Sequence, residues 1–198
     1  PYTTLFRSIV ALVGAGGKTT VLSKLVEYGR LQGQPIVVTT TTQLYESQVA
    51  QYEPIYTKDI NDVDEYCTKR IQQGYCGAWF NGITRTKVDA VDCESIDGLS
   101  ALHPNWQIVV EADGAKEKWL KAPKHTEPVI PSQTKTTIGV VNLQMLGASL
   151  DEDHVHNLEL VQSIVHREEG AIVTPHMLAQ IVLHKQGLFQ YSKGKKIL

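Results

Sequence analysis

The sequence predicts a three-layer α/β fold in which a mainly parallel sheet is covered by helices on both faces. Short apolar runs rich in Val and Ile alternate with amphipathic stretches along the chain. The first run leads into a glycine-rich loop, and a later one ends in two carboxylates. Wholly apolar strands separated by helices are typical of parallel sheets that are buried on both faces. In such sheets a ligand binds at the carboxyl ends of the strands.

The composition is that of one globular domain. The 198 residues are 42% hydrophobic and 20% charged, with a formal net charge of -2. This balance gives no reason to expect a nucleic-acid or membrane partner, and no apolar run approaches the roughly 20 residues that span a bilayer. The three cysteines (Cys67, Cys76 and Cys93) match no metal motif, which favours reduced thiols in a cytoplasmic protein.

The first three elements form a βαβ unit. Residues 8–13 predict a buried strand, residues 18–32 a helix with Val21, Leu22, Leu25 and Val26 on one face, and residues 35–39 a second buried strand. Residues 40–57 are polar and are expected to be irregular. The next elements are expected to be a helix over 59–73, a strand over 76–80 that pairs with 84–93 as an inserted hairpin around Asn81-Gly82, a short helix over 96–102 and a third buried strand over 107–110.

The remaining part begins with a loop rich in Lys and Pro. We expect this loop over 115–136, a fourth strand over 137–143, helices over 154–166 and 175–185, and a short extended piece over 171–174 between them. The last residues, Lys195 to Leu198, resemble the beginning of a strand, and the chain starts at Pro1. We therefore expect a single domain over 1–198 that continues beyond both ends.

The glycine-rich loop predicts a site for a nucleoside triphosphate. It consists of Gly14, Ala15, Gly16, Gly17, Lys18, Thr19 and Thr20. Glycines allow backbone N–H groups to turn inward, and the helix that follows adds further N–H groups and positive partial charge. A lysine in this position reaches the β- and γ-phosphates, and the Thr19 hydroxyl is a ligand for Mg²⁺. The alternative is a glycine turn that caps a helix beside a solvated lysine.

The loop is a shortened variant of the usual phosphate loop. The common pattern G-x-x-x-x-G-K-[ST] would place its first glycine at position 12, which is Leu12 here. The loop is similar to the G-x-x-G-K-T-T loop of Mur-type ligases, and it predicts a P-loop NTPase-like fold. The sequence does not distinguish ATP from GTP.

Two carboxylates follow the third strand. Glu111 and Asp113 are two residues apart, so in an extended segment they face the same side. One carboxylate can hold Mg²⁺ while the other orients water toward the γ-phosphate, and the residues do not tell which does which. We therefore predict Lys18, Glu111 and Asp113 as catalytic residues and Thr19, Glu111 and Asp113 as metal ligands. The alternative is an acidic strand end that is simply exposed.

Two further segments are candidates for the same site. The threonine run includes Thr40 and Thr41, whose hydroxyls can contact Mg²⁺ or phosphate, or can merely favour the strand. In the loop after Asp113, Lys121 and His125 are predicted to contact the nucleotide or an acceptor. The neighbouring Lys116, Lys118 and Lys124 can steer an anion or form a solvated surface. A second metal site that uses His125, Glu127, His154 and His156 is an alternative without supporting spacing.

These motifs, in this order, resemble those of the YqeC family from about residue 9 to the end of the chain. The most specific segment is Leu120-Lys-Ala-Pro-Lys-His-Thr-Glu-Pro-Val-Ile-Pro131, and the threonine run is followed here by Gln43 where the family often has His. The other segments are Gly14 to Thr20, Val38 to Thr42, Glu111 to Ala115, Ile138 to Val141 and His154 to His156. The resemblance implies an accessory role in maturing a selenium-dependent molybdenum hydroxylase or its cofactor, which would be a partner.

Three functions are compatible with these predictions. The first is a Mg²⁺-dependent enzyme that hydrolyses ATP or GTP to drive a step in cofactor maturation. The second is an ATP-dependent phosphoryl- or adenylyl-transfer enzyme, whose acceptor would be held by Lys121, Lys124 or His125. The third is a nucleotide-sensing switch or metallochaperone that binds a partner enzyme and turns over little.

Overall fold

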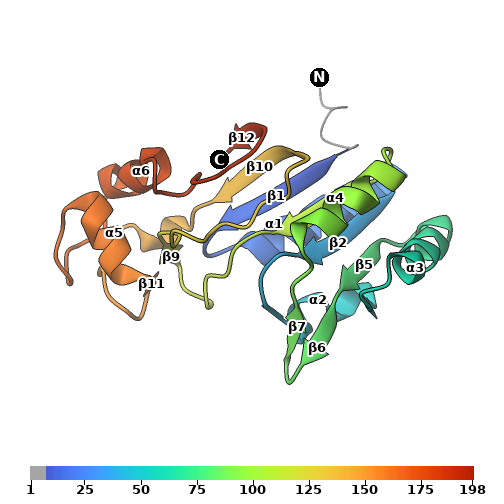
Figure 1. The fold of residues 1–198 in the computed structure, drawn as a ribbon. Helices are drawn as coiled ribbons and strands as arrows, with labels where there is room; N and C mark the ends of the chain where they lie inside the picture. The colour runs from blue at the N-terminus through green and yellow to red at the C-terminus, as the bar shows by residue number, and fades with distance from the viewer. Residues whose placement is uncertain (1–7) are drawn as a thin grey trace.

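The computed structural model describes residues 8–198 and is organised around a seven-stranded sheet in which every neighbouring pair of strands is parallel (Figure 1). The predicted α/β class with a mainly parallel sheet is therefore confirmed. In spatial order the strands are β12 (Lys195–Ile197), β10 (Thr134–Val140), β1 (Ile9–Gly14), β8 (Gln107–Glu111), β2 (Ile36–Thr40), β5 (Gly77–Phe80) and β4 (Ile55–Tyr56).

Helices cover both faces of this sheet, because alternate residues of its strands point to opposite sides. On one face, Val10, Leu12 and Ile36 form a core with α1 (Lys18–Leu31), which contributes Leu22 and Val26. On the other face, Ile9, Val37 and Ile108 pack with apolar residues of α3 (Ile60–Gln72) and α4 (Cys93–Leu102). The side chains of Asp59 and Asp92 cap the first turns of α3 and α4. Periodicity had predicted all three helices to within a few residues.

The central position of β8 decides where the functional residues meet. Strands β1 and β2 belong to one βαβ unit, but β8 lies between them and pairs with both. Glu111, the last residue of β8, is therefore in register with Leu12 on one side and with Thr40 on the other. The glycine loop, the acidic strand end and the threonine run consequently emerge at one edge of the sheet.

The expected hairpin around Asn81-Gly82 is wrong in its pairing. Strand β5 is fully buried and joins the central sheet between β2 and β4, because its four residues are apolar or glycine. The hairpin forms one step later, between β6 (Gly82–Thr84) and β7 (Lys87–Asp89), around a turn in which Arg85 has a φ of 58°. The segment predicted as irregular contains short elements: β3 (Leu44–Tyr45), which pairs with β7, the helical turns α2 (Glu46–Val49) and η2 (Ala50–Tyr52), and β4.

The C-terminal part packs a core of its own beside β10. Apolar residues of α5 (Leu158–Val165) and α6 (Pro175–Leu183) contact Met145 of the helical turn η3 (Leu143–Met145) and Leu120. Helix α5 begins four residues later than expected, because β11 (Val155–His156) pairs with β9 (Leu120–Lys121) in a separate two-stranded sheet. The loop after Asp113 is thereby fixed to this part. Within residues 8–198 no helix has the length and apolar character needed to cross a bilayer.

Candidate functional site

The glycine loop turns sharply between β1 and α1, and its geometry requires glycine. Gly14 and Gly16 have φ values of 102° and 68°, which side-chain-bearing residues rarely adopt. A Cβ atom on Gly14 would lie 2.2 Å from the carbonyl oxygen of Val140, and one on Gly16 would lie 2.5 Å from the Cβ of Asn142. The loop therefore lies directly against β10 and the segment that follows it, and this contact fixes its path.

Within residues 8–198 no side chain caps the N–H donors in the first turn of α1. Gly17 is the N-cap residue and supplies no side-chain hydrogen bond, and no acidic residue lies in the first turn. An uncapped helix N-terminus carries free N–H groups and positive partial charge, which favour an anion. The start of α1 is thus open toward the cleft that Gly16, Gly17 and Thr19 line.

Lys18 is buried, with only 5% of its side chain exposed, and it lies between the loop and the acidic strand end. Its Nζ donates a hydrogen bond to the Gly14 carbonyl at 2.6 Å. The same atom is 3.3 Å from Asp113 Oδ1 and 3.5 Å from Glu111 Oε1. The structure therefore brings together the three residues that the sequence predicts as catalytic.

Asp113 connects the glycine loop to the rest of the site. Both of its carboxylate oxygens accept from the Gly14 N–H, at 3.2 and 3.1 Å. Each oxygen also faces an ammonium group, Lys18 Nζ at 3.3 Å and Lys121 Nζ at 3.3 Å. With 2% of the residue exposed and both oxygens engaged, Asp113 holds the loop and two lysines in place.

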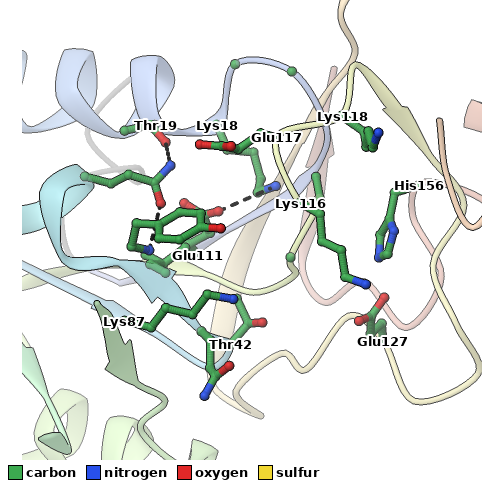
Figure 2. Close-up of a pocket in the computed structure, with 18 of the residues that line it drawn as sticks. Lys18, Thr19, Thr42, Lys87, Glu111, Lys116, Glu117, Lys118, Glu127 and His156 are labelled. Atoms are coloured by element: carbon green, nitrogen blue, oxygen red, sulfur yellow. Dashed lines mark hydrogen bonds and ion pairs between the residues drawn. The ribbon is translucent and has the colours of Figure 1, made fainter. Parts of the chain in front are cut away.

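Glu111 occupies a different position, since it lines the cleft. The ion pair to Lys18 is the one ion pair that its carboxylate makes within the described residues (Figure 2). Burial raises the pKa of Glu111 above its ordinary value, and the positive charge of Lys18 only partly opposes this rise. The geometry thus distinguishes the two carboxylates: Asp113 is a structural clamp, and Glu111 is the one available to a ligand.

The predicted threonines separate into two groups. The Thr19 hydroxyl is at the cleft and accepts a hydrogen bond from Gln48 at 3.4 Å. Thr40 and Thr41 donate their hydroxyls to backbone carbonyls, of Glu111 at 2.8 Å and of Val129 at 2.6 Å, and they do not line the cleft. These hydrogen bonds fix the end of the strand. The placement of Thr40 and Thr41 therefore supports the alternative in which the threonines merely favour the strand. The next residue of the run, Thr42, is the one that reaches the cleft.

Three other predicted residues lie away from the cleft, and Gly14, whose N–H donates to Asp113, does not line it either. Ala15 is buried and donates its N–H to Val140, and Thr20 is exposed on α1. His125 is exposed, and its carbonyl accepts a hydrogen bond from Tyr191. The imidazole at the cleft belongs instead to His156 on β11, which is paired in register with Lys121. The segment that contains His156 is one of the motifs identified in the sequence. Nothing in the local sequence, however, indicates that β11 pairs with β9 and so brings His156 to the cleft.

Lys121 is the centre of a second buried ionic group. Its Nζ donates to the Gly114 carbonyl at 2.7 Å and lies 3.0 Å from Glu127 Oε2 and 3.3 Å from Asp113 Oδ2. Burial is the largest influence on Glu127 and by itself would raise its pKa, but Lys121 and the Lys124 N–H outweigh burial and lower that pKa. Lys121 therefore lies behind the site, held between two carboxylates, rather than in the cleft.

The cleft has two walls and a volume of about 390 Å³. We call Gly16, Gly17, Lys18, Thr19 and Glu111 the phosphate-loop wall, and Lys116, Lys118, Lys124, Glu127 and His156 the facing wall. Figure 2 shows Lys18, Thr19 and Glu111 on one side and Lys118, Glu127 and His156 on the other. Sequence reasoning missed Glu117 and also the lining residues Leu44, Tyr45, Gln48 and Lys87, which come from β3, α2 and β7, elements without a motif.

The donor set at the phosphate-loop wall suits Mg²⁺. The Thr19 hydroxyl and the Glu111 carboxylate are hard oxygen ligands, of the kind that this ion takes together with water and phosphate oxygens. Three carboxylates (Glu111, Asp113 and Glu127) surround the ammonium groups of Lys18 and Lys121, which leaves one negative charge in excess. Within residues 8–198 no three His, Cys, Asp or Glu side chains cluster as metal ligands. Any Mg²⁺ held here by Thr19 and Glu111 would therefore need further ligands, which water and phosphate oxygens could provide.

Comparison with known proteins gives a family. The model of the YqeC protein family matches residues 10–159, which include the glycine loop, the acidic strand end and both walls of the cleft. The chain is also 28% identical over 184 residues to the "Uncharacterized protein YqeC" of Escherichia coli strain K12, an alignment that covers 92% of this chain and 70% of that protein. No solved structure matches. The chain belongs to the YqeC family.

Proposed function

We propose that this member of the YqeC family binds a nucleoside triphosphate with Mg²⁺ at the phosphate-loop wall and hydrolyses its terminal phosphate. The observation that carries the proposal is the position of Lys18. A buried ammonium group at an uncapped helix N-terminus, beside a cleft-facing carboxylate, is suited to a polyphosphate and its cation. The glycine loop alone would be compatible with a simple helix cap.

Each residue of the wall has a definite role in this proposal. The free N–H groups at the start of α1 and the ammonium group of Lys18 would bind the β- and γ-phosphates. Thr19 and Glu111 would hold Mg²⁺, which neutralises the charge that develops on the phosphate oxygens. Glu111 would also orient the attacking water, directly or through a neighbouring water, because it is the carboxylate that lines the cleft.

Asp113 would act through the loop rather than on the nucleotide. Its contacts with Gly14 and Lys18 would hold the loop in the turned conformation. A site that is already ordered avoids the entropic cost of ordering a loop upon binding. Asp113 is therefore a positioning residue, in contrast to its predicted role as a metal ligand.

Calorimetric titration with non-hydrolysable ATP and GTP analogues in the presence of Mg²⁺ tests the binding step. In the Lys18→Ala variant, affinity should fall by tenfold to about 100-fold, because a charge-assisted hydrogen bond contributes roughly 1.5–3 kcal/mol. Lys24→Ala is the matched control, since Lys24 is exposed on the same helix and pairs with Glu27. Equal affinity of the Lys18→Ala variant and the wild type would contradict the proposal.

Phosphate release tests the chemical step. Glu111→Gln should keep most of the affinity for the nucleotide analogue and lose release of inorganic phosphate, because an amide neither binds Mg²⁺ well nor orients water as a base. Free phosphate produced by the wild type without any acceptor supports hydrolysis. Turnover that depends wholly on an added acceptor would replace hydrolysis with group transfer.

We further propose that the activity serves the maturation of a selenium-dependent molybdenum hydroxylase in the cytoplasm. The support is the ordered set of YqeC-like motifs, which extends from the glycine loop to His156 and lies within the matched residues. Purification of a tagged chain from cells should recover such a hydroxylase when the nucleotide analogue is present. If the Lys18→Ala chain recovers the same amount of hydroxylase as the wild type, binding of the partner does not depend on binding of the nucleotide.

A further inference from the structure

The facing wall of the cleft carries more positive charge than its carboxylate can neutralise. Glu127 is already paired with Lys121 at 3.0 Å. Lys116 and Lys124 are exposed at this wall, and within the described residues neither ammonium group makes an ion pair. The other two acidic residues that line the cleft are Glu117, next to Lys116 in the chain, and Glu111 on the phosphate-loop wall, which is paired with Lys18. The wall therefore presents free cations to the interior of the cleft.

His156 lies among these cations, and its ring has no hydrogen-bond partner within residues 8–198. It is half-buried on β11, and Lys121, Lys116 and Lys124 all act on it electrostatically. Figure 2 shows Lys116 extending toward His156 and Glu127. A half-buried ring without a partner, beside two unpaired ammonium groups, is suited to an anion that would complete its hydrogen bonding.

The backbone of this wall is held in an unusual conformation. Lys116 and Glu117 both have positive φ values, 47° and 61°, which residues other than glycine rarely adopt. The turn is fixed on its far side, where the N–H groups of Trp119 and Leu120 donate to the His154 carbonyl. Strained residues that are fixed by their surroundings cluster at ligand-binding positions. Here the conformation places the side chains of residues 116–118 at the cleft.

We propose that the facing wall binds a second, anionic ligand, a small molecule with a carboxylate or phosphate group, beside the terminal phosphate of the nucleotide. The inference rests on the proposed function in one respect, because the nucleotide is placed on the opposite wall. Lys116 and Lys124 bind the charge of this ligand, and His156 hydrogen-bonds to one of its oxygens. The cleft is continuous between the walls, so the two ligands lie together.

Sulfate, a doubly charged oxyanion, is the probe for this subsite. It is titrated by calorimetry into the Lys18→Ala protein without nucleotide and into the wild type saturated with Mg²⁺ and the ATP analogue. One sulfate should bind in both cases. The Lys116→Gln/Lys124→Gln double variant should weaken sulfate binding by about tenfold or more. The Lys58→Gln/Lys135→Gln variant, which removes the same charge from exposed positions away from the cleft, should not change it.

Nuclear magnetic resonance locates the bound anion. The His156 ring signal, assigned through His156→Gln, should shift upon addition of sulfate, and the signal of the exposed His125 should not. Equal weakening by both double variants would overturn the proposal, as would loss of sulfate binding in Lys18→Ala protein whose circular dichroism shows that it is folded like the wild type. Equal weakening of sulfate and nucleotide binding by Lys116→Gln/Lys124→Gln would also overturn it, by assigning the facing wall to the nucleotide. If the nucleotide analogue does not bind to the wild type, the proposed function fails. The titration of sulfate into Lys18→Ala without nucleotide still tests the anion subsite.

Discussion

The phosphate-loop wall and the facing wall of the cleft both carry lysines, but these lysines are held differently. Lys18, with Lys121 behind it, is buried and lies within 3.5 Å of two carboxylates. Lys116 and Lys124 are exposed, and no ion pair forms at either within residues 8–198. A buried ammonium group must be paired to be tolerated, whereas an exposed one keeps its water.

This difference separates residues that stabilise the fold from residues that the fold does not need. Removing one partner of a buried ion pair leaves an uncompensated charge in the interior and costs several kcal/mol. Removing an exposed and unpaired lysine changes stability little. Substitutions of Lys18 should therefore affect folding and binding together, and those of Lys116 and Lys124 should affect binding alone.

The largest effect is expected for Asp113→Asn. The amide would remove the charged partner that Lys18 and Lys121 share and would leave each lysine with one carboxylate, so we expect the free energy of unfolding to fall by about 1.5–3 kcal/mol, the usual cost of a hydrogen bond to a charged group. Urea unfolding measures this change, with Asp153→Asn as the control, because the Asp153 carboxylate is exposed. A fall in nucleotide affinity with unchanged stability would place Asp113 among the ligands and not in the structural clamp.

An effect of opposite sign is expected for Glu111→Gln. Because burial raises the pKa of Glu111, its ionised form destabilises the folded protein once the pH exceeds the value of the unfolded chain. The amide removes this penalty, so the thermal midpoint of the variant should exceed that of the wild type at pH 8 and the gain should shrink at pH 5. Mg²⁺ with the nucleotide analogue should stabilise both proteins by a similar amount, because the variant keeps most of its affinity. A lower midpoint for the variant at pH 8 would show that its ion pair with Lys18 outweighs the cost of burial.

A smaller effect is expected from His156. Burial, with help from Lys121 and Lys116, lowers its pKa, so the unfolded chain takes up a proton first as the pH falls. The contribution of His156 is therefore fully present above the pKa of the unfolded chain and is lost as the pH falls through the lower value in the folded state. Between pH 7.5 and 5 the wild type should lose roughly 2 °C or less in thermal midpoint relative to His156→Gln. Sulfate should reverse this loss, and an equal pH dependence of the two proteins would exclude the electrostatic environment described for the ring.

The smallest effect is expected for Lys116→Gln/Lys124→Gln. Both ammonium groups are exposed and unpaired within the described residues, so the free energy of unfolding should stay within about 0.5 kcal/mol of the wild type. Urea unfolding of the double variant, beside Lys58→Gln/Lys135→Gln, checks this. If the double variant lost as much free energy of unfolding as Asp113→Asn, the lysines of the two walls would not differ in their contribution to stability.

Local chemistry determined a large part of this protein. The loop that joins β1 to α1 could be located because only glycine tolerates its backbone angles and because a buried apolar run precedes it. The helices could be located because apolar residues recur on one face and Asp59 and Asp92 begin two of them. The grouping of Lys18, Glu111 and Asp113 followed from the rule that parallel strands end at one edge of a sheet.

Other features depended on which strands become neighbours, and strand order leaves no mark on local sequence. The position of β8 between β1 and β2 fixed Glu111 beside both polar strand ends. The pairing of β9 with β11 brought His156 to the cleft instead of His125 and buried Lys121 behind it. The carboxylates are alike in sequence, and only burial and hydrogen-bond partners distinguished the clamp Asp113 from the cleft-facing Glu111. The sequence by itself therefore determined which residues gather at the sheet edge, and the tertiary structure decided what each one faces, because long-range pairing sets the surroundings of a side chain.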